Sequence, residues 1–128
     1  MPFVRAGGLL YVSGQISKDG ETLLVGKLGD GKSEEDGQNA ARICAINLIA
    51  QVRAACDGDL DRVARVVKLT GFVNSAPDFI NQPQVVNGAS DLMVAVFGDR
   101  GRHARSAVGV GSLPFGVMVE IEGIFDIG

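Results

Sequence analysis

The sequence lacks the features that mark several classes of protein. Its 128 residues include no tryptophan, one histidine and two cysteines, and aromatic residues make up only 5% of the chain. The formal net charge of -3 gives no attraction to nucleic acid or to an anionic membrane. No apolar run reaches the roughly 18 residues of a membrane span, and the N-terminus lacks the apolar stretch of a signal peptide. We therefore expect a cytoplasmic protein without a membrane partner.

The two cysteines favour neither a disulfide nor a metal site. Cys44 and Cys56 fall on one predicted helix, which separates them by roughly 18 Å along its axis, whereas a disulfide needs Cα atoms within about 7 Å. With only His103 to join them, they do not form a metal-ligand pattern. We expect both to be buried as small apolar side chains, and we expect no metal ion.

The hydrophobic pattern predicts one domain over residues 1–128. Ser33 is a plausible N-cap, with acidic residues at 34–36 in the first turn of a helix that ends near Gly58. A second helix is predicted over 85–99. Alternation and β-branched residues predict strands over 7–17, 21–29, 61–75, 105–110 and 117–126. The order ββ-α-β-α-ββ indicates an α+β fold, with a single mixed β-sheet and two helices packed on one face.

Strand parity predicts where the charged residues of the last two strands lie, since successive residues point to opposite faces. In the last strand, Met118, Glu120 and Glu122 are expected on the face opposite the helices. In the preceding strand, Arg105 and Ala107 are expected on that same open face. A face that mixes apolar residues with isolated charges is often covered by another subunit.

Arg105 and Glu120 are the candidate catalytic residues. An arginine can hold a carboxylate through two parallel hydrogen bonds, and a glutamate can hold a water molecule and exchange a proton with it. The alternative is an Arg–Glu pair that ties two neighbouring strands together, with Glu122 as a second partner. His103 is expected in a solvent-exposed loop, or else as a residue that lines the pocket.

The stretch GKLGDGKS at 26–33 matches the phosphate-binding pattern GxxxxGK[ST] between a strand and a helix. However, three carboxylates follow at 34–36, where the phosphate oxygens would lie. We interpret the stretch as a glycine-rich loop that runs into a helix cap, not as a nucleotide site.

Three stretches carry a family resemblance. They are YVSGQIS at 11–17, ARS at 104–106 and SLPFGVMVEIEGI at 112–124. Together they resemble the RidA family (also called YjgF/YER057c/UK114), whose members share a chorismate-mutase-like fold. The resemblance covers nearly the whole chain, with the predicted element order intact.

The resemblance implies a homotrimer with three clefts, each lined by two neighbouring subunits. It also implies a hydrolase, a deaminase that converts reactive 2-imino and 2-enamino acids to 2-oxo acids and ammonia without a cofactor. By the same resemblance, Arg105 would hold the substrate carboxylate and Glu120 the attacking water. Gly14, Asn87 and Ala107 would line the pocket.

The sequence departs from the deaminase pattern at two places. Ala107 stands where that branch often has cysteine, and the pocket tyrosine of the deaminases belongs to a segment expected before residue 2, outside this sequence. The chain therefore resembles a divergent branch. Two alternatives stay open. One is a trimeric binder of small carboxylates such as 2-oxo acids. The other is an RNA-directed role, since some relatives are called endoribonuclease L-PSP or translation inhibitors; the acidic balance and sparse aromatics argue against it.

Overall fold

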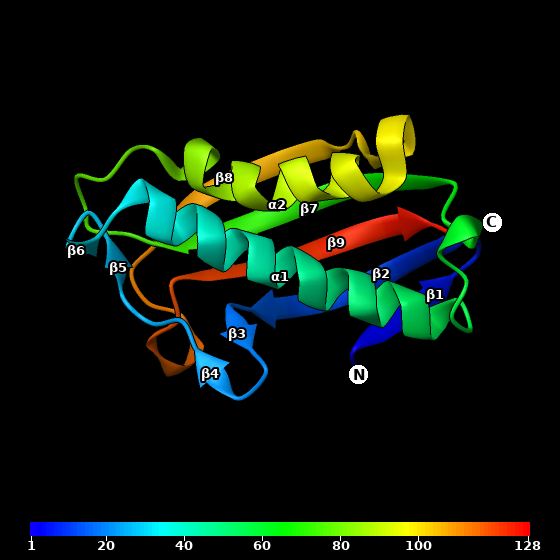
Figure 1. Ribbon diagram of the computed structural model, residues 1–128, viewed down its shortest axis with the longest axis horizontal. Helices are drawn as coiled ribbons and strands as arrows, with labels where there is room; N and C mark the ends of the chain where they lie inside the picture. The colour runs from blue at the N-terminus through cyan, green and yellow to red at the C-terminus, as the bar shows by residue number, and fades with distance from the viewer.

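The computed structural model describes residues 1–128, and its two long helices lie across one face of a five-stranded sheet (Figure 1). The sheet contains, in spatial order, β1 (Phe3–Ala6), β2 (Leu9–Ile16), β9 (Val119–Asp126), β7 (Arg65–Asn74) and β8 (Ala104–Val110). Only β7 and β8 run parallel to each other; the other neighbours are antiparallel. The predicted α+β fold with a mixed sheet is confirmed.

The first helix, α1 (Glu34–Ala55), begins as the sequence predicts. The Ser33 side chain accepts a hydrogen bond from the Asp36 amide, and the Asp36 carboxylate accepts one from the Ser33 amide. This reciprocal capping box satisfies two amides that would otherwise lack partners. Because the box occupies the end of the GKLGDGKS stretch, that stretch leads into a helix cap, as predicted.

The second helix, α2 (Gln82–Phe97), connects β7 to β8 and packs directly on α1. Their close approach depends on Gly88, since a Cβ atom there would lie 2.1 Å from the backbone oxygen of Gln38. Real Cβ contacts are never so short, so any larger residue would push the helices apart. Gly88 thereby fixes where its neighbours on α2 lie relative to the sheet.

None of the helices combines the length and apolar character needed to cross a membrane.

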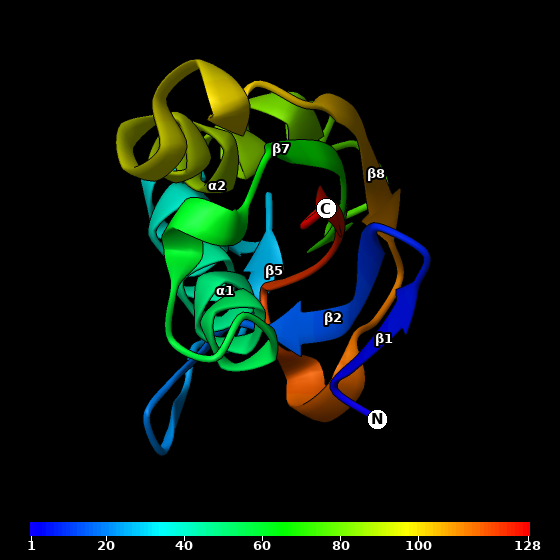
Figure 2. The ribbon, with the colours of Figure 1, turned by 90° about the vertical axis from the view of Figure 1, so that its right-hand side faces the viewer.

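The core lies between the helices and the sheet, as the end-on view shows (Figure 2). It contains 24 buried residues, and the face of α1 that joins it carries mainly small side chains, which let the helix approach the sheet closely. Cys44 and Cys56 are both buried and free, so the prediction of two structural thiols is confirmed.

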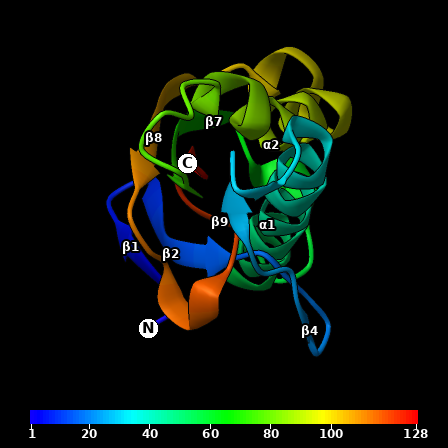
Figure 3. The same cartoon turned by 90° about the vertical axis from the view of Figure 1, so that its left-hand side faces the viewer.

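The N-terminal third differs from the prediction in detail. The strand Phe3–Ala6 was not predicted, because its four residues include Arg5 and are followed at once by Gly7 and Gly8. The predicted strand at 21–29 yields only short pairs, one of which projects past α1 (Figure 3). The minor elements are β3 (Lys18–Asp19), β4 (Thr22–Leu23), β5 (Lys27–Leu28), β6 (Gly31–Lys32), η1 (Leu60–Arg62), η2 (Gly98–Gly101) and η3 (Pro114–Gly116).

The register of β7 with its two neighbours defines the faces of the sheet. Leu69 of β7 is buried on the helix side and pairs with Gly123 of β9 and Arg105 of β8. The next residue, Thr70, pairs with Glu122, and Phe72 pairs with Glu120, so both glutamates lie on the open face. β7 therefore separates the strand that carries Arg105 from the strand that carries the glutamates.

Candidate functional site

Arg105 lies on the edge strand β8 and points toward α2. Its Nη1 atom donates to Asn87 Oδ1 at 2.7 Å and to Ser90 Oγ at 3.2 Å. Both acceptors belong to α2, where residues three apart share a face. The prediction that Arg105 shares the open face with the glutamates is therefore wrong: the arginine is on the helix side.

The physical reason for the error is the character of the open face. Alternation within β8 was correct, but the helices cover the side that carries Arg105 and leave open the side that carries Val108. Val108 is 43% exposed and pairs with Phe72 on the open face. Ala107 is the residue of β8 that packs against the core. Met118 is also misplaced by the parity prediction, because it is 3% exposed and belongs to the core.

No carboxylate in the chain neutralises Arg105. The two salt bridges join Arg62 to Asp57 and Arg102 to Asp99. The alternative in which Arg105 and a glutamate tie neighbouring strands together is also wrong, because β7 lies between β8 and β9. The guanidinium is held by neutral oxygens at Nη1 alone. Its remaining N–H groups stay available for an anionic partner.

His103 lies in the loop that precedes β8, as predicted, but it is half-buried and not solvent-exposed. Its Nδ1 atom is 2.6 Å from the Gly101 carbonyl oxygen, and its Nε2 atom is 2.9 Å from Ser90 Oγ. Burial lowers the pKa of the imidazole, the positive charge of Arg105 lowers it further, and the hydrogen bond to Gly101 acts in the opposite direction. The lowered pKa favours the neutral ring at pH 7.

A shallow pocket of about 230 Å³ lies beside the guanidinium. Its lining consists of Ser90, Val94, Arg102, His103 and Arg105. No carboxylate lines the pocket, and although Arg102 is paired with Asp99, Arg105 has no such partner, so the pocket favours an anion despite the negative charge of the whole chain.

Ser90 was not recognised as a site residue from the sequence. Its position three residues after Asn87 on a predicted helix places it on the same face, which was the available signal. The predicted pocket residue Asn87 does contact Arg105. Ala107 follows Arg105 by two positions on β8, so its side chain is on the same face of the sheet.

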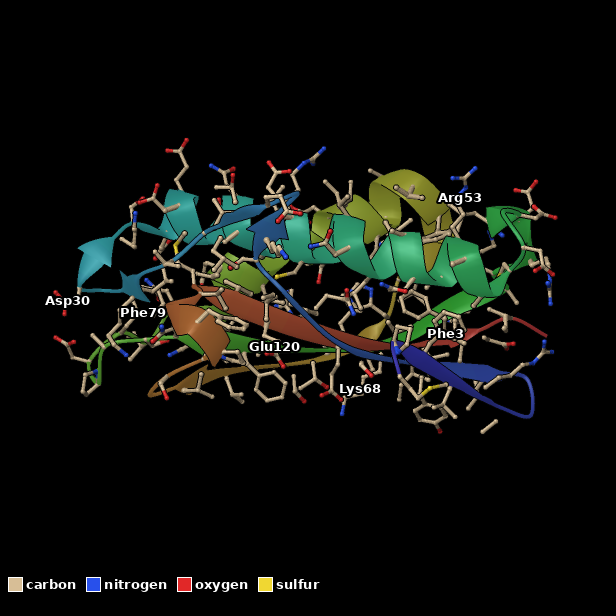
Figure 4. The ribbon with its side chains drawn as sticks, turned by 90° about the horizontal axis from the view of Figure 1, so that it is seen from below. Phe3, Asp30, Arg53, Lys68, Phe79 and Glu120 are labelled. Atoms are coloured by element: carbon tan, nitrogen blue, oxygen red, sulfur yellow. The ribbon has the colours of Figure 1, made fainter.

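Glu120 and Gly14 form a second group, on the open face. A Cβ atom at Gly14 would lie 2.3 Å from Glu120 Oε2, so the carboxylate rests directly over the glycine backbone. Burial raises the pKa of Glu120, and the negative charge of Glu122 raises it further. Figure 4 shows Glu120 and Lys68 on the side of the sheet opposite the helices. The predicted site residues thus divide between the two faces.

The comparisons with known proteins agree with this fold. Residues 1–122 match the family described as "YjgF/chorismate mutase-like, putative endoribonuclease". The chain belongs to the YjgF (RidA) family. This YjgF-family chain has no group of three or more His, Cys, Asp or Glu side chains that could hold a metal ion.

Proteins that are similar to this chain in sequence and structure range from 31% to 51% identity. The Trypanosoma cruzi protein TCP17 is 51% identical over 127 residues, which is 98% of this chain and 79% of that protein. The structure of Atu1372 from Agrobacterium tumefaciens, a protein of unknown function, is 48% identical with a TM-score of 0.98, covering 100% of this chain and 81% of that one. A "putative endoribonuclease" from Shewanella oneidensis MR-1 is 31% identical with a TM-score of 0.94, covering 98% and 83%.

Proposed function

We propose that the protein hydrolyses small, reactive 2-imino and 2-enamino acids to 2-oxo acids and ammonia, in clefts between the subunits of a cytoplasmic homotrimer. The observation that carries the proposal is the state of Arg105. Its guanidinium is positioned by two neutral oxygens and has no carboxylate partner within the chain. Such a group suits a substrate carboxylate, which it can bind through two parallel hydrogen bonds.

The division of the site between two faces supports an assembly of several subunits. Arg105 faces α2 at the sheet edge, while Glu120 is on the open face with β7 between their strands. A site that uses both residues therefore needs Arg105 of one subunit and Glu120 of a neighbour. The open face also suits a subunit contact, because Tyr11 is 45% and Val108 43% exposed there.

The proposed reaction needs binding and proton transfer but no cofactor. Arg105 holds the substrate carboxylate, and the Glu120 carboxylate takes a proton from a water molecule whose oxygen bonds to C2 of the imine. The proton reaches the imine nitrogen and gives the carbinolamine. The hydroxyl proton of the carbinolamine then moves to the nitrogen, for which Glu120 can serve as the carrier, the C2–N bond breaks as the C2=O bond forms, and ammonia and the 2-oxo acid leave. An enamine substrate first takes a proton at C3. The backbone at Gly14 and Ala107 lines the pocket.

Positioning supplies most of the rate increase in this scheme. An imine already reacts with water unaided, so holding both reactants in one orientation is the main requirement. The raised pKa of Glu120 suits it to exchange a proton closer to neutral pH than an ordinary carboxylate would.

The test is 2-oxo acid release from freshly generated 2-aminoacrylate or 2-iminobutanoate. We expect the wild type to accelerate release and Arg105→Ala to lose the acceleration. Arg53→Ala is the matched control, because Arg53 is exposed on α1 (Figure 4) and does not line the pocket beside Arg105. Saturable binding of pyruvate without any acceleration would contradict the deaminase and support a small-carboxylate binding protein. RNA cleavage lost in Arg105→Ala would support the endoribonuclease instead.

A further inference from the structure

The hydrogen bonds around His103 assign every donor and acceptor between Gly101 and Arg105. A carbonyl oxygen only accepts, so the short contact to Gly101 places the proton on His103 Nδ1. In the neutral ring Nε2 then carries no proton and must accept from Ser90. Ser90 gives its only proton to Nε2, which leaves its oxygen lone pairs to accept from Arg105 Nη1.

This sequence of bonds requires a neutral imidazole. The charge that acts on His103 is that of Arg105 on β8, and Arg102, next to His103 in the chain and bonded to Asp99, lines the same pocket. From α2, the pocket receives only the uncharged Ser90 and Val94. The surroundings therefore contain more positive than negative charge, which disfavours the protonated ring.

We propose that Ser90 and His103 are positioning residues for Arg105. They hold Nη1 from one side while Asn87 holds it from the other, so the rest of the guanidinium presents its free N–H groups to a carboxylate. The proposal rests on the proposed function for what that carboxylate is, but the positioning itself is a property of the unliganded chain.

The location of these groups supports positioning over a purely structural role. Ser90, His103 and Arg105 all line the same shallow pocket. The hydrogen bonds that run from Gly101 through His103 and Ser90 end at the Arg105 guanidinium, which has no carboxylate partner in the chain. They do not end at a group that only joins one part of the fold to another. A long arginine side chain loses rotamer entropy when a ligand immobilises it, and anchoring in advance reduces that cost of binding.

The first test needs no ligand and measures the Nη protons of Arg105 by NMR on the intact protein. In the wild type we expect slow rotation of the guanidinium, with separate signals. Ser90→Ala removes the oxygen that accepts from Arg105, and His103→Leu removes the nitrogen that accepts from Ser90. Both variants should let the guanidinium rotate faster, so that its signals merge. Ser90→Thr keeps the hydroxyl, and His103→Gln offers a side-chain oxygen that accepts from Ser90, so both should restore separate signals. Equal rotation in the wild type and in Ser90→Ala would overturn the proposal.

The second test measures pyruvate affinity and thermal stability of the same variants at pH 7.5. We expect Ser90→Ala and His103→Leu to bind about three- to tenfold more weakly, with Ser90→Thr and His103→Gln close to wild type. A loss of thermal stability without any change in affinity would overturn the positioning role. If the guanidinium is held in the wild type but pyruvate does not bind, the proposed function fails and the positioning stands.

Discussion

The two faces of the sheet differ in how they hold their charged residues. On the helix side, Arg105 is anchored by Asn87 and Ser90, both from α2 of the same chain. On the open face, Glu120 rests over Gly14 beside another carboxylate, Glu122, and its pKa is raised. A guanidinium whose hydrogen-bond partners are neutral can still bind an anion. A glutamate beside a like charge has a raised pKa and therefore accepts a proton more readily. The difference predicts that one face serves binding and the other serves turnover.

The largest effects should separate these two roles. We expect Arg105→Ala to weaken pyruvate binding about 100-fold, since a charge-assisted bidentate contact is lost. Glu120→Gln should leave the Kd of pyruvate nearly unchanged and lower turnover by about 100-fold or more, because the general base is lost. Titration calorimetry and steady-state rates measure the two effects. Equal loss of binding in both variants would remove the distinction between the faces.

Gly14→Ala tests the open face with a single methyl group. The new Cβ would collide with Oε2 of Glu120, and the carboxylate at the end of a flexible side chain would move aside. We expect turnover to fall about tenfold or more, since small displacements of catalytic groups are costly, with pyruvate affinity preserved. Gly111→Ala is the matched control, because its Cβ would meet no atom within 4 Å. An unchanged rate in Gly14→Ala would argue against a role for Glu120.

The raised pKa of Glu120 predicts a pH-dependent stability difference. Its protonated form is favoured in the fold, so the stabilising contribution is present below the usual value of 4.5 and is lost as pH rises through the raised pKa. Glu120→Gln cannot ionise and should therefore melt above the wild type at pH 8 but not at pH 4. Thermal melts across this range measure it, with Glu21→Gln, an exposed glutamate, as control. A lower melting temperature for Glu120→Gln at pH 8 would contradict the shift.

The smallest expected effect concerns Glu122. Glu122→Gln removes the like charge that raises the pKa of Glu120, so the acidic limb of the pH–rate profile should move to lower pH. Burial is the larger cause of the raised pKa, so most of the shift should remain in the variant. A profile that moves to higher pH would show that Glu122 supports ionisation of Glu120 instead of opposing it.

The sequence predicted the elements better than the faces. The Ser33 cap, the two helices and the buried cysteines follow from local patterns and are confirmed. The prediction of the face that carries Arg105 was wrong. Both faces of β8 carry apolar residues, so alternation alone does not show which face the helices cover. Pairing between β7 and β8 decides this, and it depends on contacts far apart in the sequence. Ser90 was missed for the opposite reason: a lone helical serine becomes informative only beside Asn87 and His103.

The central claim, that Arg105 and Glu120 act together only across two subunits, is tested most directly by mixed assembly. Arg105→Ala and Glu120→Gln chains with different tags are co-expressed, and trimers that carry both tags are isolated and assayed. Each inactive chain supplies the residue that the other lacks. We expect the isolated mixed trimers to show about a third of wild-type activity, since in any symmetric trimer that contains both variants one cleft of the three pairs an intact Arg105 with an intact Glu120 of its neighbour. Mixed trimers with no activity above that of either variant alone would contradict the claim.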